Sequence, residues 1–319
     1  MSVSGKLGPR GSPPKSEGGL PTKREPEDPV RVLVLYGPPG AGKTRTAVAA
    51  LAALHRMGLE AGRAVVPVVV DFEGGLEGVS AALRRMGAVV LSYDRYAGEA
   101  GAGSSPAFGF VRHVRDRLWE LREKHRGADL AVVVDSLSMM TTRLQAEIAG
   151  AMERAFGRRR TGRDGLEAFL QAHALVDRDS YRHTKTAVLG LFNAIAAVNP
   201  RLTVYIAHPR DEAVTDPETG PVVLRRPDLP PAVWSFVERQ AGVVARVRPG
   251  PVVSIAPDLP KAAEASGEAV PVRSAVKDRS RLFGDGRELP AAEFVRRLVS
   301  RLSPVPDPAE EGREEVRGG

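Results

Sequence analysis

Eight consecutive residues, from Gly37 to Thr44, have the types and spacing needed to bind phosphate. They read Gly-Pro-Pro-Gly-Ala-Gly-Lys-Thr and match the pattern G-x-x-x-x-G-K-[ST]. The glycines allow successive backbone N–H groups to turn inward and form a concave anion site. Lys43 adds a positive charge near the β- and γ-phosphates of a nucleotide, and the Thr44 hydroxyl can ligate Mg²⁺.

The segments on either side of this loop are those that the motif requires. Residues 32–36 form a continuous apolar run that is typical of a buried parallel strand. After the loop, an Ala-rich segment carries a helical stripe of Val48, Leu51, Leu54 and Met57, and Gly58 is a natural helix stop. Strand, loop and helix in this order predict a site for ATP and Mg²⁺. The predicted nucleotide-binding residues are Gly37, Pro38, Pro39, Gly40, Ala41, Gly42, Lys43, Thr44 and Arg45.

Two later apolar runs end in carboxylates. The run 130–134 ends in Asp135, a Walker B pattern in which the carboxylate holds the Mg²⁺ shell from a neighbouring strand. A second run ends in Asp71 and is followed by Glu73, at the kind of strand tip where open α/β sheets place ligand chemistry. Hydrolysis needs a carboxylate that orients and deprotonates water. The loop sequence by itself also resembles that of AAA+ ATPases, which place a catalytic Glu directly after the Walker B Asp. Here Ser136 follows Asp135, so Glu73 is the best candidate.

Composition bounds the class of protein more than its activity. The chain has 319 residues, of which 42% are hydrophobic, so it can build one large core or two small ones. A formal charge of +7 permits an acidic partner such as nucleic acid. The absence of cysteine excludes disulfides and thiolate metal sites. Neither a signal segment nor a bilayer-spanning run is evident, so we expect a soluble cytoplasmic protein without membrane contacts.

Three segments differ in composition. Residues 1–29 are rich in Pro and Gly and predict a disordered basic arm, and residues 303–319 predict a disordered acidic tail. Between them, residues 30–302 predict one α/β ATPase domain, with a mostly parallel central sheet flanked by helices and a C-terminal antiparallel hairpin over residues 243–255. Further strands are expected at 64–71, 88–91, 202–207 and 272–276, and helices at 79–86, 184–198 and 291–302.

Over residues 30 to about 290, these motifs resemble those of RecA-like ATPases. Asp71-Phe72-Glu73-Gly-Gly is similar to the strand that carries the family's catalytic glutamate, and residues 133–137 are similar to its Walker B strand. His208 follows a strand at the position of the family's γ-phosphate sensor, which is commonly Gln; His can donate the same hydrogen bond. Lys277-Asp278-Arg279 resembles the K-x-[KR] pair that RecA-like and DnaB-like proteins insert into the neighbouring subunit's site.

The resemblance implies a homo-oligomer, as a ring or a filament, in which ATP hydrolysis is coupled to binding of single-stranded DNA. The catalytic residues that it implies are Lys43, Glu73, His208, Lys277 and Arg279, the last two acting in trans. A single core without a helicase's additional domain is similar to phage-encoded RecA-like ATPases of the Sak single-strand-annealing type. We therefore expect a role in DNA recombination or repair, in the cytoplasm of a bacterium or of a phage-infected cell.

Two polar segments correspond in position to the family's DNA-contacting loops. The first contains Arg158, Arg159, Arg160 and Arg163 between glycines, and the second is the Pro-rich stretch Pro209–Pro231 with Arg210. Arginines suit the phosphate backbone, although a solvated loop explains the first cluster equally well. A loop of over twenty residues is usually functional in a compact domain. Tyr181 and Trp234 are available for base stacking or for core packing.

Two other functions are compatible with the same motifs. A RecA-core ATPase can regulate or assemble a protein partner, in which case nucleic acid does not change its activity. A P-loop kinase transfers phosphate to a small molecule, and the arginines between positions 158 and 163 then form its lid. Free phosphate as the product favours an ATPase, and a phosphorylated acceptor favours a kinase.

Overall fold

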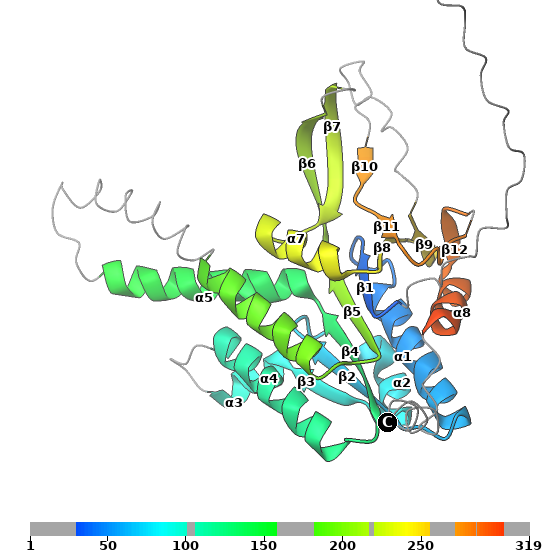
Figure 1. Cartoon of the computed structure of the whole chain (residues 1–319). Helices are drawn as coiled ribbons and strands as arrows, with labels where there is room; N and C mark the ends of the chain where they lie inside the picture. Colours follow the sequence, from blue (N-terminus) through cyan, green and yellow to red (C-terminus); the bar gives the residue numbers. More distant parts are fainter. Residues whose placement is uncertain are drawn as a thin grey trace, which may run out of the picture.

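Nine strands form one mixed, mostly parallel sheet with helices on both faces (Figure 1). The computed structural model describes residues 30–100, 106–157, 182–216, 220–255, 272–284 and 286–302. The strand order is β12-β9-β8-β1-β5-β4-β2-β3, and β11 also pairs with β8. The strands are β1 (Val32–Tyr36), β2 (Val65–Asp71), β3 (Val89–Ser92), β4 (Asp129–Asp135), β5 (Leu202–Ala207), β8 (Val243–Arg248), β9 (Val252–Ser254), β11 (Lys277–Asp278) and β12 (Glu288–Pro290).

The six central strands from β8 to β3 are parallel, whereas β9, β11 and β12 join antiparallel at one side. Most of their residues are apolar and buried, because helices cover both faces of the sheet; β1, β2, β4 and β5 are nearly continuous apolar runs. The β8–β9 pair confirms the predicted C-terminal hairpin. The sheet therefore confirms the α/β class with a mostly parallel centre.

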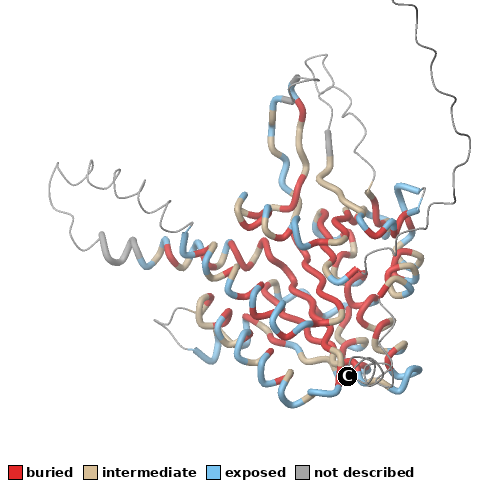
Figure 2. The backbone as a smooth tube through the Cα atoms, viewed as in Figure 1, coloured by how far each residue is buried: buried red, intermediate tan, exposed pale blue. Residues whose placement is uncertain are grey.

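Two helical layers bury the two faces of the sheet, and side chains alternate between them. Along β1, Val34 and Tyr36 belong to one apolar cluster, while Leu33 and Leu35 belong to the other. Figure 2 shows the buried residues concentrated in the sheet and on the helix faces turned towards it. The first layer contains α3 (Tyr93–Ala100), α4 (Pro106–Lys124), α5 (Leu137–Gly157), the helix over residues 182–197 and α7 (Pro231–Gln240). The second contains α1 (Lys43–Glu60), the 3₁₀ helix η1 (Glu77–Val79), α2 (Ser80–Arg85) and α8 (Ala291–Arg301).

Most of the predicted helices and strands are present, but some elements differ from the prediction. Gly58 does not end α1, which continues to Glu60. The helix is capped by a hydrogen bond of 3.0 Å from the N–H of Ala61 to the carbonyl of Met57. Helices α3 and α7 were not expected from the sequence. Within the described ranges, no helix has the length and apolar character needed to cross a membrane.

The segment predicted as a long loop, Pro209–Pro231, is instead a β-hairpin followed by the start of α7. Strand β6 (Pro209–Asp216) pairs antiparallel with β7 (Gly220–Pro227), and β10 (Val272–Ser274) adds to β7 in parallel. The hairpin stands away from the main sheet directly after β5 (Figure 1). The loop prediction was wrong because Pro209 and Pro227 lie opposite each other at the base of the hairpin, where proline does not break the pairing.

Candidate functional site

The strand register brings the predicted polar residues to one edge of the sheet. Strand β5 lies between β1 and β4, and β2 lies on the far side of β4. Tyr36 is level with Ala207, and Asp71 is level with Asp135. The residues that follow these strand ends, Gly37, His208, Ser136 and Glu73, therefore emerge together. This convergence is a consequence of parallel strands that end at the same level.

The loop Gly37–Thr44 connects β1 to α1, and the backbone conformation at Gly42 would be strained in any other residue. Gly42 is the N-cap of α1 and has φ of 93°, in the left-handed region. The N-cap glycine has no side chain that could cap α1, so the first N–H groups of the helix are available to an anion bound in the loop. The N-terminus of α1 is therefore uncapped at the position where the motif places phosphate.

Lys43 is held at the mouth of the loop by the loop's own backbone. Its Nζ donates hydrogen bonds to the carbonyl oxygens of Gly37, at 2.8 Å, and Pro38, at 3.0 Å. The residue is only 7% exposed. Burial lowers the pKa of Lys43, and the nearby carboxylates of Glu73 and Asp135 oppose that shift. An ammonium group that is largely removed from water is well placed to bind a polyanion, because solvent screens its charge less.

Thr44 and Asp135 form the pair expected to hold Mg²⁺. The Thr44 hydroxyl donates to Asp135 Oδ2 at 2.6 Å. Asp135 is 2% exposed, and burial raises its pKa to about 6. Among the described residues, nothing donates a hydrogen bond to its other buried oxygen, Oδ1. A buried carboxylate oxygen without a partner, beside a hydroxyl, suits a hydrated Mg²⁺, so these residues fit that ion.

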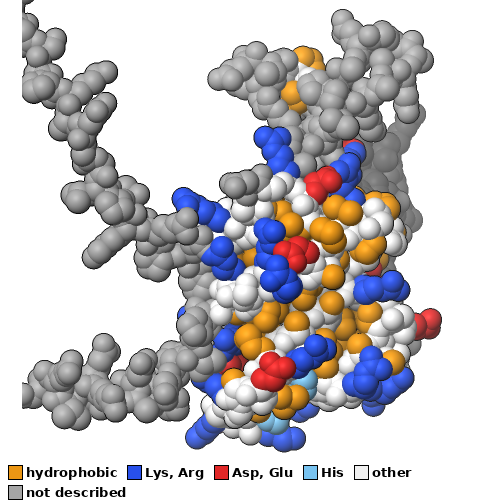
Figure 3. Space-filling view, turned by 90° about the vertical axis from the view of Figure 1, so that its right-hand side faces the viewer, with side chains coloured by type: hydrophobic (Ala, Val, Ile, Leu, Met, Phe, Trp, Pro, Cys, Tyr) orange, Lys and Arg blue, Asp and Glu red, His pale blue; other side chains and the backbone are white. Residues whose placement is uncertain are grey.

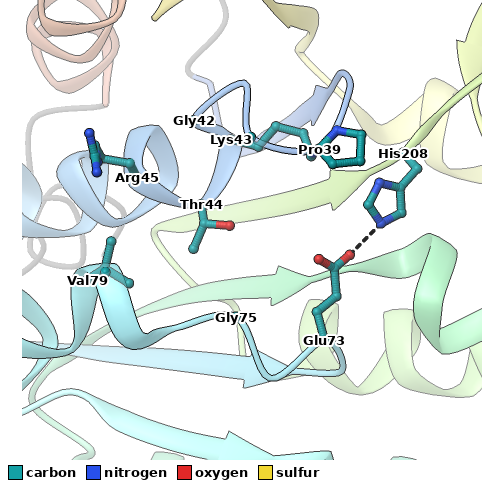
Figure 4. A pocket seen from close by; sticks show the side chains of 11 residues that line it. Pro39, Gly42, Lys43, Thr44, Arg45, Glu73, Gly75, Val79 and His208 are labelled. Carbon is teal, nitrogen blue, oxygen red and sulfur yellow. Dashed lines mark ion pairs between the residues drawn. The ribbon is translucent and has the colours of Figure 1, made fainter. Parts of the chain in front are cut away.

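The carboxylate of Glu73 points towards the phosphate loop and is held from two sides (Figure 4). His208 Nε2 lies 2.7 Å from Glu73 Oε1, and the Ser136 hydroxyl donates to the same oxygen. The hydrogen bond from His208 is the largest influence that lowers the pKa of Glu73, ahead of the opposing effect of burial. The backbone is fixed as well, because Asp71 Oδ1 accepts from the N–H groups of Glu73 and Gly74 at 3.0 and 2.9 Å. Glu73 is therefore an ionised, oriented carboxylate.

These groups share one cavity of about 360 Å³ between the phosphate loop and the segment after β2. On the loop side it is lined by Pro39, Gly40, Gly42, Lys43, Thr44 and Arg45, and on the other by Glu73, Gly75, Gly78, Val79 and His208. The cavity extends past the residues of the loop to Gly78 and Val79 of η1, which no motif in the sequence indicated. Ser136 was also missed as a Glu73 partner, because their contact depends on the pairing of β2 with β4.

Lys277 and Arg279 do not reach this cavity in their own chain. Lys277 is level with Val244 on β8, and the N–H of Arg279 bonds to the Gly242 carbonyl at 2.9 Å. Gly242 in turn donates to the carbonyl of Val32, at the start of β1. Arg279 is thus at the opposite end of the sheet from Gly37, about 16 Å away along the strand direction at 3.3 Å per residue. Lys277 Nζ instead donates to the carbonyl of Glu238.

The predicted DNA contacts are described only in part. Arg158, Arg159, Arg160, Arg163 and Tyr181 lie outside the described residues. Arg210 is exposed on β6 and lies 3.8 Å from Asp228. Trp234 is 8% exposed and packs in the apolar cluster between α7 and the sheet. Its burial supports core packing rather than base stacking.

No protein-family model matches this chain, and no curated protein matches it. The functional assignment therefore rests on the geometry of the site. An α/β sheet brings the loop Gly37–Thr44, a carboxylate that fits Mg²⁺ and a second, oriented carboxylate to one edge. Nucleotide hydrolysis requires groups of these kinds.

Proposed function

We propose that the chain is an ATPase with a RecA-like core. The observation that supports this most directly is that Lys43, Thr44 and Glu73 line one cavity, with Asp135 bonded to Thr44 behind it. Lys43 and the N–H groups at the start of α1 bind the phosphates. Thr44 and Asp135 would hold Mg²⁺, whose charge would offset that of the phosphates. Glu73 accepts a proton from the attacking water.

The environment of Glu73 supports its assignment as the base. A general base must be ionised, and the low pKa of this carboxylate meets that condition throughout the neutral range. Among the described residues, both side-chain hydrogen bonds to the carboxylate are made to Oε1, so we assign the second oxygen as the one that accepts the proton from water. His208 touches Glu73 in this structure, and its role as a phosphate sensor stays a prediction.

We further propose that the partner is single-stranded DNA and that the activity belongs to recombination or repair, as in the Sak-type ATPases that the motifs resemble. The net charge of +7 supports a polyanionic partner. The test is phosphate release from ATP with and without single-stranded DNA. DNA should raise turnover, and free phosphate rather than a phosphorylated acceptor should be the product, which separates an ATPase from a kinase.

The arginine cluster offers a sharper test of DNA contact. Replacing Arg158, Arg159, Arg160 and Arg163 with Ala should lower the affinity for single-stranded DNA and reduce the slope of log K against log salt by up to about 3. The matched control removes the same charge from four exposed surface arginines, Arg95, Arg115, Arg126 and Arg296. Equal affinities in the two variants would remove the cluster from the DNA site.

The protruding hairpin favours a second candidate, an ATPase that acts on a protein partner. Arg225 is paired with Asp211 at 2.6 Å, and Arg226 with Glu212 at 2.7 Å. The strands carry as much acidic as basic charge, so the hairpin offers little net attraction to phosphate. Turnover that nucleic acid does not change would favour this candidate over the DNA-dependent one.

Oligomerisation would complete the site. Because neither Lys277 nor Arg279 lines the cavity of its own chain, we propose that they act in the neighbouring subunit's site, where such cations contribute about 10³- to 10⁵-fold to turnover in other systems. Each of two variants, Glu73→Gln and the double variant Lys277→Ala/Arg279→Ala, should be inactive alone. Mixed one to one, they should restore activity at about one site in four.

The control for this complementation is a mixture of Glu73→Gln with Lys43→Ala. Both changes disable a subunit's own site, so this mixture should stay inactive. A lack of recovery in a mixed oligomer of the first pair, or equal recovery in both mixtures, would contradict action in trans.

A further inference from the structure

The position of the Glu73 carboxylate depends on a three-residue turn, Phe72 to Gly74, that follows β2. The inner side of this turn is fixed by Asp71, which accepts two backbone hydrogen bonds. The N–H of Phe72 also bonds to the carbonyl of Asp135 at 2.6 Å, which ties the turn to β4. The carbonyl of Phe72 faces the other way, towards α5.

Arg143 on α5 binds that carbonyl. Its Nε donates to Phe72 O at 2.9 Å, and its Nη2 lies 3.3 Å from Asp94 Oδ1. The guanidinium carbon is 4.0 Å from the centre of the Tyr93 ring, so the cation also stacks on an aromatic face. The side chain is 27% exposed. Three contacts on one planar group define its position closely, and lysine cannot reproduce them.

Asp94 supports the turn from its other end. Gly74 has φ of 80°, and a Cβ built on it would lie 2.6 Å from Asp94 Oδ2. The carboxylate that pairs with Arg143 therefore also packs directly against the residue after Glu73. Arg143 and Asp94 together hold both ends of the turn, one by a hydrogen bond to Phe72 and the other by contact with Gly74.

We propose that Arg143 is a positioning residue for Glu73, and that the Arg143–Asp94 pair keeps the water-activating carboxylate aimed at the nucleotide. This inference rests on the proposed function, in which Glu73 is the base. Arg143 is not among the residues that line the nucleotide cavity, so its removal leaves the contacts to the phosphates in place. It acts on the chemical step alone, because misplacing a catalytic group by about 1 Å can cost on the order of 10²-fold in rate.

The test compares Arg143→Met with wild type in nucleotide binding, measured with a fluorescent ATP analogue, and in ATP turnover. We expect kcat to fall by about 10- to 100-fold while KM and analogue affinity change by less than about twofold. Arg143→Lys should be nearly as impaired, because it keeps the charge but loses the planar group. The matched control is Arg117→Met, which removes an arginine from an exposed ion pair on α4.

A double-mutant cycle distinguishes a positioning role of Arg143 from a purely structural one. If Arg143 acts through Glu73, Arg143→Met should cost nothing further when added to Glu73→Gln. Should Arg143→Met fail to fold in thermal unfolding, Asp94→Ala tests the same clamp from the other end and should give the same loss in kcat. Wild-type turnover in folded Arg143→Met, or an undiminished loss in the Glu73→Gln background, would overturn the inference. Turnover that is insensitive to Glu73→Gln would instead contradict the proposed function.

Discussion

Glu73→Gln should bind ATP with unchanged affinity and lose about 10²- to 10⁴-fold in turnover. Glutamine has the size of glutamate and can still accept the hydrogen bonds that Ser136 and His208 make to Oε1, so the turn stays in place. What it lacks is a carboxylate that takes a proton from water. The measurement is steady-state phosphate release alongside binding of a fluorescent ATP analogue.

The control for this substitution is Glu99→Gln, which changes an exposed carboxylate that pairs with Arg95 on α3. It should leave both binding and turnover at the wild-type level. If Glu73→Gln hydrolyses ATP at the wild-type rate, Glu73 is not the base, and a RecA-like mechanism for this site is contradicted even if nucleotide still binds.

Lys43→Ala should abolish nucleotide binding as well as turnover. Removing one member of a buried, hydrogen-bonded charge pair costs about 2–5 kcal/mol, which corresponds to at least about a thirtyfold loss of affinity. The loss is expected near the upper end because Lys43 is buried against the loop and approaches the phosphates directly. Affinity for the ATP analogue and thermal stability, measured on the same preparation, report the effect.

Lys124→Ala, in the exposed last turn of α4, provides the matched loss of one lysine. It should bind nucleotide as wild type does. An unchanged affinity in a folded Lys43→Ala variant would show that the triphosphate binds elsewhere, and the assignment of Gly37–Thr44 as the phosphate loop would then be wrong.

The parts of the candidate site that depend on short-range patterns could be predicted from the sequence. An apolar run followed by Gly37–Thr44 and an amphipathic segment specifies strand, loop and helix, and all three are present. Asp135 and Glu73 were both predicted at the site because each follows a buried run, and open α/β sheets place ligand chemistry at the strand tips. The register of Asp71 with Asp135 shows the same placement.

Contacts between segments that are distant in the sequence could not be predicted from local patterns. Arg143 and the carbonyl of Phe72 are 71 positions apart, and nothing in the local pattern of α5 indicates that one arginine on it turns towards β2. Ser136 and Glu73 meet only because β2 pairs with β4, a pairing that the sequence does not specify by itself. Tertiary pairing, rather than local propensity, determines these contacts.

The hairpin shows how composition misleads when pairing is ignored. Prolines and charges made residues 209–231 resemble a loop, yet Asp211 is directly opposite Arg225, and their ion pair stabilises β6 against β7. The surface in Figure 3, which shows the side of the molecule with α1 and α8, carries an apolar area bordered by lysines and arginines. From the sequence alone, the positions of these surface charges could not be predicted, because they depend on which strands and helices are neighbours.

The most direct test of the site is one assay that records bound nucleotide and released phosphate for three proteins: wild type, Lys43→Ala and Glu73→Gln, each with ATP and Mg²⁺. The geometry predicts that wild type binds and hydrolyses, that Lys43→Ala does neither, and that Glu73→Gln binds without hydrolysing. Equal phosphate release from wild type and Glu73→Gln, or equal nucleotide binding by wild type and Lys43→Ala, would contradict a single hydrolytic site at this edge of the sheet.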